Sequence, residues 1–75
     1  MQPDHADSLH GLGVLALGRG QSGQAIAFIG RAVAARPEVA LYYINLGLAL
    51  RDQGHVEQAR AALQVAVLRL SLIHI

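Results

Sequence analysis

The sequence predicts an all-α fold made of two stacked, antiparallel helix-turn-helix units. Three observations predict it: the chain repeats itself at a shift of 34 residues, its apolar residues recur at helical spacing, and glycine or proline separates the apolar segments. The matched pairs include Leu12 and Leu46, Gly13 and Gly47, Gly20 and Gly54, Ala25 and Ala59, Ala32 and Ala66, and Pro3 and Pro37. Stacked units of this kind form extended surfaces that bind other chains.

Apolar spacing and turn residues define the first unit. Its first helix is expected over residues 6–17, followed by Gly20, because glycine adopts the left-handed conformation at low steric cost. Its second helix is expected over 23–35, with Ser22 as N-cap and with Arg36-Pro37 as the stop, because a residue before proline avoids the helical region. The apolar stripes are Leu9, Leu12, Leu15 and Ala16 in the first helix, and Ala25, Ile26, Ile29, Ala32 and Val33 in the second.

The second unit repeats this plan. Its first helix is expected over 39–53 with Gly54 at the end, and its second helix begins near residue 56. The stripe of that last helix is Ala59, Ala62, Leu63, Ala66 and Val67. Because the connections are only a few residues long, successive helices must run antiparallel. Of the two adjacent tyrosines, Tyr43 is expected to pack inside and Tyr42 to lie nearer the junction with the first unit.

The repeated positions also predict how the helices within a unit approach each other. Small residues at Gly13, Ala25 and Ala32 allow close contact, and larger residues are expected to fill the layer between the helices. These larger residues are Leu12, Ile29, Leu46 and Leu63. An interior glycine weakens a helix by roughly 1 kcal/mol relative to alanine. The first unit, which contains Gly11 and Gly30, is therefore expected to be the less stable of the two.

Composition excludes several functional classes. The 75 residues form at most one small domain. The hydrophobic fraction of 53% indicates an apolar face that another helix or chain would cover. A net charge of +1 without basic clusters predicts neither nucleic-acid binding nor attachment to a membrane. The chain has no cysteine, and its first residues lack a signal-peptide pattern. A soluble, cytoplasmic protein is therefore expected.

The sequence shows no catalytic or metal-binding constellation, so we expect no enzyme activity, no cofactor and no metal. The histidines include no pair at the i, i+4 spacing that suits zinc. They are His5, His10, His55 and His74. Residues 11–16 fit a loose dinucleotide-binding pattern, but that pattern requires a strand before it and a helix after it. Here it lies inside a predicted helix, which argues against a nucleotide site.

The matched positions resemble the tetratricopeptide repeat (TPR), a helix-turn-helix unit of 34 residues. On this resemblance the first repeat is 6–39 and the second 40–69, within one domain of residues 1–69. The positions that the family favours are matched by Leu9 and Tyr43, Leu12-Gly13 and Leu46-Gly47, Ala25 and Ala59, Ala32 and Ala66, and Pro37. The resemblance covers about 65 residues. It implies an α-solenoid that forms the start of a right-handed superhelix.

The resemblance also implies a protein or peptide ligand, bound along the concave face that the first helix of each repeat forms. The residues expected on this face are Asp7, His10, Gly11, Val14, Leu41, Ile44, Asn45, Leu48 and Arg51. Asn45 is of most interest, because its amide can both donate to and accept from a bound backbone. Arrays similar to those of O-linked N-acetylglucosamine transferases repeat such an asparagine, whereas the first repeat here has Gly11 instead. A purely structural role of Asn45 is the alternative.

Two further interpretations stay open. Residues 5–10 resemble the start of TPR arrays in multidomain bacterial enzymes, namely glycosyltransferases similar to O-linked N-acetylglucosamine transferase, or sulfotransferases. Any catalysis would then lie outside this chain. Alternatively, the repeats serve only as a spacer or as an oligomerisation surface. Further TPR units of a parent chain are expected partners, and two units alone leave the outer face of the last helix uncovered, which favours self-association.

Both ends of the chain depart from the repeat pattern. Pro3 stands where the proline of a preceding repeat would be, and Ser71 stands where another such proline is expected. Residues 70–75 resemble one reading frame of a transposon end that is used as a sequencing adapter. We therefore expect 70–75 to be a non-native tail, and the chain to be a fragment of a longer bacterial array. A natural apolar extension of the last helix is the alternative.

Overall fold

The computed structural model describes residues 5–73, and all regular structure in that range is helical. The helices are α1 (His5–Gly18), α2 (Ser22–Ala35), α3 (Ala40–Asp52) and α4 (Val56–Ile73). The predicted all-α class is thereby confirmed, and the predicted bounds agree within a few residues. Helix α4 continues past Arg69 to Ile73, whereas α2 ends at the equivalent Ala35. Pro3 and residues 74–75, on which the expectations about the chain ends also depend, lie outside the described range.

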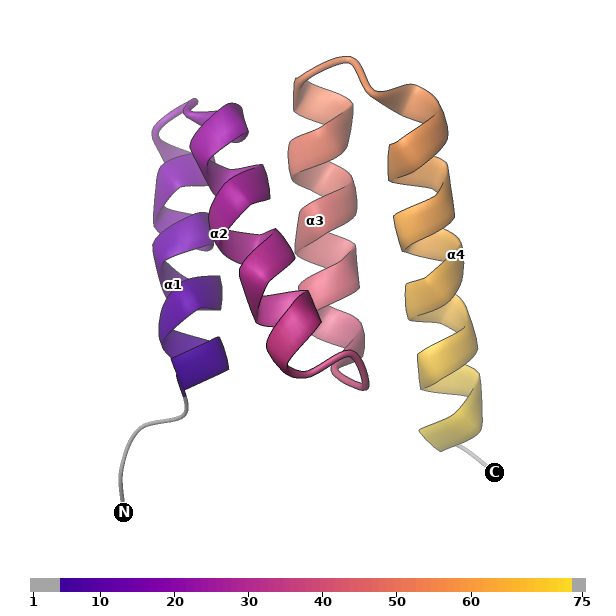
Figure 1. The fold of residues 1–75 in the computed structure, drawn as a ribbon. Helices are drawn as coiled ribbons and strands as arrows, with labels where there is room; N and C mark the ends of the chain where they lie inside the picture. The colour runs from indigo at the N-terminus through magenta and orange to yellow at the C-terminus, as the bar shows by residue number, and fades with distance from the viewer. Residues whose placement is uncertain (1–4, 74–75) are drawn as a thin grey trace.

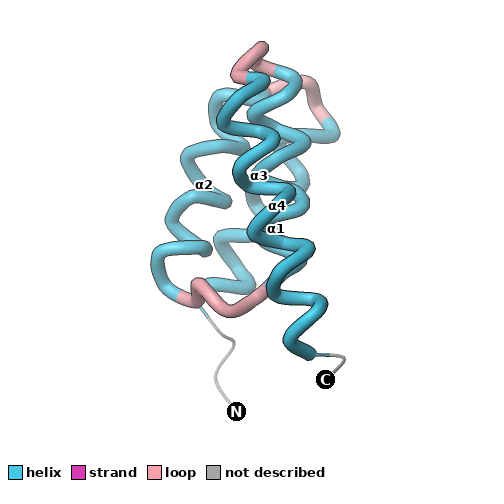
Figure 2. Tube along the Cα trace, turned by 90° about the vertical axis from the view of Figure 1, so that its right-hand side faces the viewer, coloured by secondary structure: helices cyan, strands magenta, loops and turns pink. Residues whose placement is uncertain are grey.

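Tight turns reverse the chain after each helix, so that successive helices run antiparallel across Figure 1. Helix α1 packs on α2, α3 packs on α4, and α2 joins the two hairpins by packing on α3. A smaller contact connects α1 directly to α3. In the turned view of Figure 2, α2 is offset to one side of the other helices. Among residues 5–73, one surface of α1 and α3 is therefore left without a covering helix.

The turns inside the two hairpins have the same geometry. Gly20 and Gly54 take positive φ values of 73° and 86°, which a side chain would disfavour. In both turns the N–H of the next residue donates to a carbonyl five residues earlier, at 2.9 Å. This bond closes the helix end in the manner of a glycine C-cap. The predicted turn positions are thereby confirmed.

The close contact inside each hairpin is also repeated. A Cβ atom at Gly47 would lie 2.8 Å from Leu63 Cγ, and one at Gly13 would collide with Ile29. In both hairpins a backbone carbonyl oxygen of the partner helix lies 3.3 Å from the same Cβ position. Because Ile29 and Leu63 are themselves equivalent positions, one packing arrangement occurs twice in the molecule. Glycine is therefore required where α1 meets α2 and where α3 meets α4.

The core between the helices is built largely from alanine. The largest fully buried side chains are Tyr42 and Ile29. The buried alanines are Ala6, Ala16, Ala25, Ala32, Ala40, Ala49, Ala59, Ala62 and Ala66. Small side chains bring helices close together, but each removes little apolar surface from water. The fold therefore combines tight helix contacts with a small hydrophobic contribution to stability.

Of the two adjacent tyrosines, the one expected in the interior is the less buried. Tyr42 is only 1% exposed and packs with Ala6, Leu9 and Ala32, which confirms its place at the junction with the first hairpin. Tyr43 is half-buried rather than a core residue. Neighbouring helical positions point about 100° apart, and the position of Tyr42 faces α1 and α2 together. The best-buried aromatic residue is therefore the one at the junction.

Two further predictions are wrong, one about packing and one about helix capping. Leu12 is 48% exposed, whereas its equivalent Leu46 packs into the core against α2. The difference arises because none of the described helices covers that side of α1. Ser22 is the first residue of α2 and not its N-cap, which is Gln21. The Ser22 hydroxyl instead donates to Gln53 Oε1 at 2.9 Å. This hydrogen bond connects the start of α2 to the turn after α3.

Candidate functional site

The residues expected to bind a ligand lie on α1 and α3, the two helices that contact each other directly. Within each helix most of them are spaced three or four residues apart, which places them on one side of that helix. We call this surface the α1/α3 face. Its residues are Asp7, His10 and Val14 from α1, and Leu41, Ile44, Asn45 and Leu48 from α3. Gly11, also expected here, is exposed, with open space where a Cβ atom would be.

Four polar side chains connect α1 to α3 at this face, and we call them the polar cluster. The Tyr42 hydroxyl donates to Asp7 Oδ1. Asn45 Nδ2 lies 2.8 Å from His10 Nε2. The rings of His10 and Tyr42 lie against each other, with centroids 4.7 Å apart and planes inclined by 33°. The structure therefore brings together three of the predicted residues, and it adds Tyr42 to them.

The hydrogen bond between Asn45 and His10 defines the protonation state and the tautomer of the histidine ring. An amide nitrogen can only donate, so His10 Nε2 must accept, and the proton of the neutral ring lies on Nδ1. Burial lowers the pKa of His10 below its usual 6.5, and the nearby Asp7 charge opposes this effect in part. Both observations describe a neutral histidine at pH 7. A positively charged ring could not accept this hydrogen bond.

Asn45 can still accept a hydrogen bond from a ligand while its amide nitrogen is bonded to His10. Within residues 5–73 its carbonyl oxygen, Oδ1, has no hydrogen-bond partner, and the side chain is only half-buried. The oxygen could accept a hydrogen bond from a backbone N–H of a bound chain. The two roles considered for Asn45 are therefore compatible, because the nitrogen connects two helices while the oxygen stays available.

Tyr42 is the site residue that sequence reasoning missed. The sequence places it only nearer the junction with the first unit, and an aromatic residue at helical spacing usually belongs to a core. Its position three residues before Asn45 puts both side chains on the same side of α3. That spacing is the signal in the sequence that could have placed Tyr42 beside the polar cluster.

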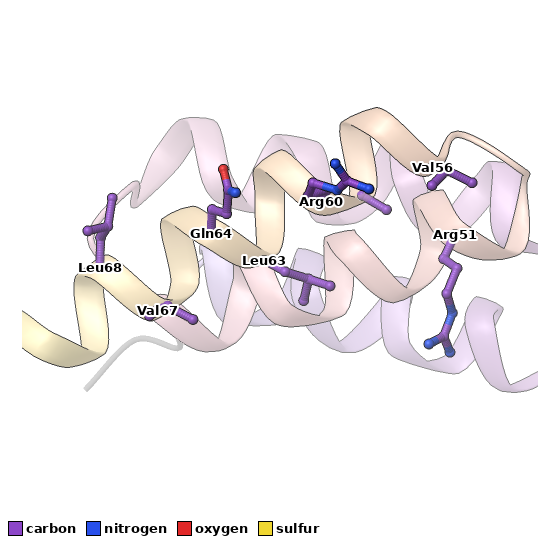
Figure 3. A pocket seen from close by; sticks show the side chains of 8 residues that line it. Arg51, Val56, Arg60, Leu63, Gln64, Val67 and Leu68 are labelled. Carbon is purple, nitrogen blue, oxygen red and sulfur yellow. The ribbon is translucent and has the colours of Figure 1, made fainter.

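Apolar side chains continue the α1/α3 face beside the polar cluster. Leu41 is 53% exposed and Val14 is also exposed. Ile44 and Leu48 are half-buried, so that each presents part of its side chain to solvent. Arg51, expected on the same face, lines a different hollow between α3 and α4 (Figure 3). The α1/α3 face is thus an apolar strip with hydrogen-bonding groups next to it.

The hollow in Figure 3 lies on the outer side of the second hairpin and has a volume of about 650 Å³. Its main apolar residues are Val56, Leu63, Val67 and Leu68, and two arginines, Arg51 and Arg60, also line it. It contains no acidic side chain and no histidine among its lining residues. The hollow therefore has the character of an apolar packing surface.

Residues 5–73 contain no group of three histidine, cysteine or acidic side chains that could hold a metal ion. None of the described helices combines the length and the apolar character needed to cross a membrane. Comparisons with protein-family models, with curated proteins and with solved structures return no match. The features of the chain that bear on its function are therefore the α1/α3 face and the internal repeat.

Proposed function

We propose that the chain is a TPR-like module that binds a protein or peptide segment along the α1/α3 face. On this proposal the two hairpins are consecutive units of an α-solenoid, and α1 and α3 line its concave side. The repeated turn geometry at Gly20 and Gly54 supports the proposal, as does the repeated close contact at Gly13 and Gly47. The role is to bind a partner and not to catalyse a reaction.

The observation that carries the proposal is the combination of exposed apolar side chains and an available amide oxygen on one face. Val14 and Leu41 are exposed, although a small chain gains stability by burying such residues. Full burial of an aliphatic side chain by a ligand contributes about 1.5–3 kcal/mol. Asn45 Oδ1 adds a hydrogen-bond acceptor for the ligand backbone. The expected ligand is therefore a peptide segment with apolar side chains and accessible backbone N–H groups.

The test is a selection from a display library of random linear peptides on the immobilised chain, followed by titration of one selected peptide. Leu41→Lys places a charge on the α1/α3 face at an exposed position. Ala27→Lys makes the same change in charge at an exposed position of α2. We expect Leu41→Lys to weaken peptide binding at least about tenfold, which corresponds to about 1.4 kcal/mol, and Ala27→Lys to leave it unchanged.

Two results would count against this function. One is a selection that yields no sequence binding above background. The other is equal affinity for the Leu41→Lys and Ala27→Lys variants, because binding would then not depend on the α1/α3 face. Circular dichroism of both variants establishes that the helices are retained, so that a loss of affinity reports on the surface and not on folding.

A further inference from the structure

The hollow between α3 and α4 corresponds, position by position, to the surface of the first hairpin that α3 covers. At a shift of 34 residues, Leu63 is equivalent to Ile29, and Val67 is equivalent to Val33. Ile29 is 0% exposed and packs with Ala49 of α3, and Val33 packs against the same cluster. The hollow is therefore the same helix-binding surface, repeated one unit later. Among the described residues no helix covers it, and Val67 is 61% exposed.

The residues with which α3 covers the first hairpin identify what fits the hollow. Leu46 and Ala49 of α3 pack into the cluster around Ile29. Their equivalents on α1 are Leu12 and Leu15. These two leucines are 48% and 53% exposed, because no helix of the part of the chain that the structure describes lies on that flank of α1. Helix α1 thus carries apolar side chains at the positions that the hollow requires, on a flank that has no partner of its own.

We infer that the chain self-associates head to tail, with α1 of one copy packed into the hollow between α3 and α4 of the next. The contact would reproduce the way in which α3 packs on α2 within one copy. It would cover the exposed Leu12 and Leu15 of one copy and the exposed Val56 and Val67 of the other. The two surfaces are different, so the contact is heterologous, and each added copy leaves a free surface at both ends. Association therefore proceeds beyond the dimer.

Charge is expected to limit the strength of this contact. Within one copy Gln53 reaches the start of α2 at Ser22. The equivalent residues in the contact are Arg19, in the turn after the incoming α1, and Val56 in the hollow, where Arg51 and Arg60 also lie. Arginines of the two copies would thus approach one another. Salt screens such repulsion between exposed charges, so association should become tighter as ionic strength increases.

The test is sedimentation velocity over about a hundredfold range of concentration, with two variants that each block one surface. Leu15→Lys charges the α1 flank, and Val67→Lys charges the hollow. Ala61→Lys is the matched control, because it changes an exposed position of α4 that does not line the hollow. We expect the wild type and the control to form species larger than a dimer, and each blocking variant alone to associate at least about tenfold more weakly.

An equal mixture of the two blocking variants distinguishes head-to-tail packing from other arrangements. Leu15→Lys retains an intact hollow and Val67→Lys retains an intact α1, so the mixture should form dimers and nothing larger. The dimer would also establish that both variants are folded. A monomeric wild type throughout, a monomeric mixture, or unimpaired association of Leu15→Lys alone would each overturn the inference. The blocking substitutions are at Leu15 and Val67, which are not residues of the α1/α3 face, so failure of self-association here does not count against the proposed peptide binding.

Discussion

At the scale of single residues, the polar cluster determines how α1 and α3 are held relative to each other. Asp7 and His10 lie on α1, and each contacts a polar residue of α3 that is 35 positions further along the chain. Hydrogen bonds between two helices fix their rotation as well as their distance. The geometry of the α1/α3 face therefore depends on side chains that also border the candidate ligand site.

Asn45→Ala should lower both stability and peptide affinity. Removing the amide deprives His10 Nε2 of its donor, so the free energy of unfolding should fall by roughly 0.5–1.5 kcal/mol. Denaturant titration measures the loss, with Gln58→Ala, at an exposed position of α4, as the control. A double-mutant cycle with His10→Ala should give a coupling energy of similar size. Additive effects of the two substitutions would mean that the bond contributes nothing.

Stability should decrease as pH falls below about 6.5, the usual pKa of histidine, because of His10. Its pKa is lowered in the folded state, so the unfolded chain binds a proton first, and this protonation favours unfolding. The decrease continues down to the folded-state pKa of His10 and then stops. One proton limits the slope to about 1.4 kcal/mol per pH unit.

The matched variant for this pH dependence is His10→Gln, which cannot titrate. The difference in unfolding free energy between the two proteins, measured by denaturant titration from pH 7.5 downward, reports on His10 alone. It should shrink or reverse in favour of the variant as the pH falls. A difference that stays constant with pH, or that grows in favour of the wild type, would contradict the assignment of His10 as a neutral acceptor.

At the scale of the helices, glycines with different surroundings should respond in opposite ways to the same substitution. A methyl group at Gly13 would collide with Ile29, but at Gly11 of the same helix it meets no atom within 4 Å. Gly13→Ala should therefore destabilise by about 1–3 kcal/mol through overpacking. Gly11→Ala should stabilise by roughly 1 kcal/mol, because alanine favours the helix. Thermal unfolding measures both, and equal effects would contradict the close contact in the hairpin.

The C-terminal extension of α4 should contribute little to stability. Ala66 is the last buried position of the repeat, and Leu70 and Ser71 are exposed. A chain that ends at Arg69 should unfold within about 0.5 kcal/mol of the full chain, as for changes at exposed positions. Its helical signal in circular dichroism should fall only by the share of the residues removed. A larger loss would mean that residues 70–75 belong to the folded unit.

The sequence predicts the helices and turns better than it predicts how one helix is rotated against another. Helix bounds and turns follow from local signals, such as the left-handed glycines Gly20 and Gly54. The contact between Asn45 and His10 depends instead on how α3 rotates against α1, which no local pattern encodes. The same rotation decides that Tyr42 is buried more deeply than Tyr43. The repeat therefore predicts which helices form the candidate face, but not which of its side chains bond to each other.

At the scale of the whole molecule, two surfaces with different roles follow from one repeated unit. The α1/α3 face carries polar and apolar groups, and it is the surface where we propose that a peptide ligand binds. The outer flanks of α1 and α4 present apolar groups that correspond to a stacking contact, with Leu15 on one flank and Val67 on the other. A core made mostly of alanine contributes little to the free energy of unfolding. A partner bound at either of these two surfaces should therefore add substantially to the stability of the chain.

The most direct test of the account is to map a selected peptide onto the chain by NMR, through amide chemical shifts of the ¹⁵N-labelled protein. The account predicts that the largest shifts cluster at Val14, Leu41 and Asn45, with smaller changes along the rest of α1 and α3. Saturable shifts that cluster at Val56 and Val67, or on the outer side of α2, would contradict it, because the peptide would then bind at a surface other than the α1/α3 face.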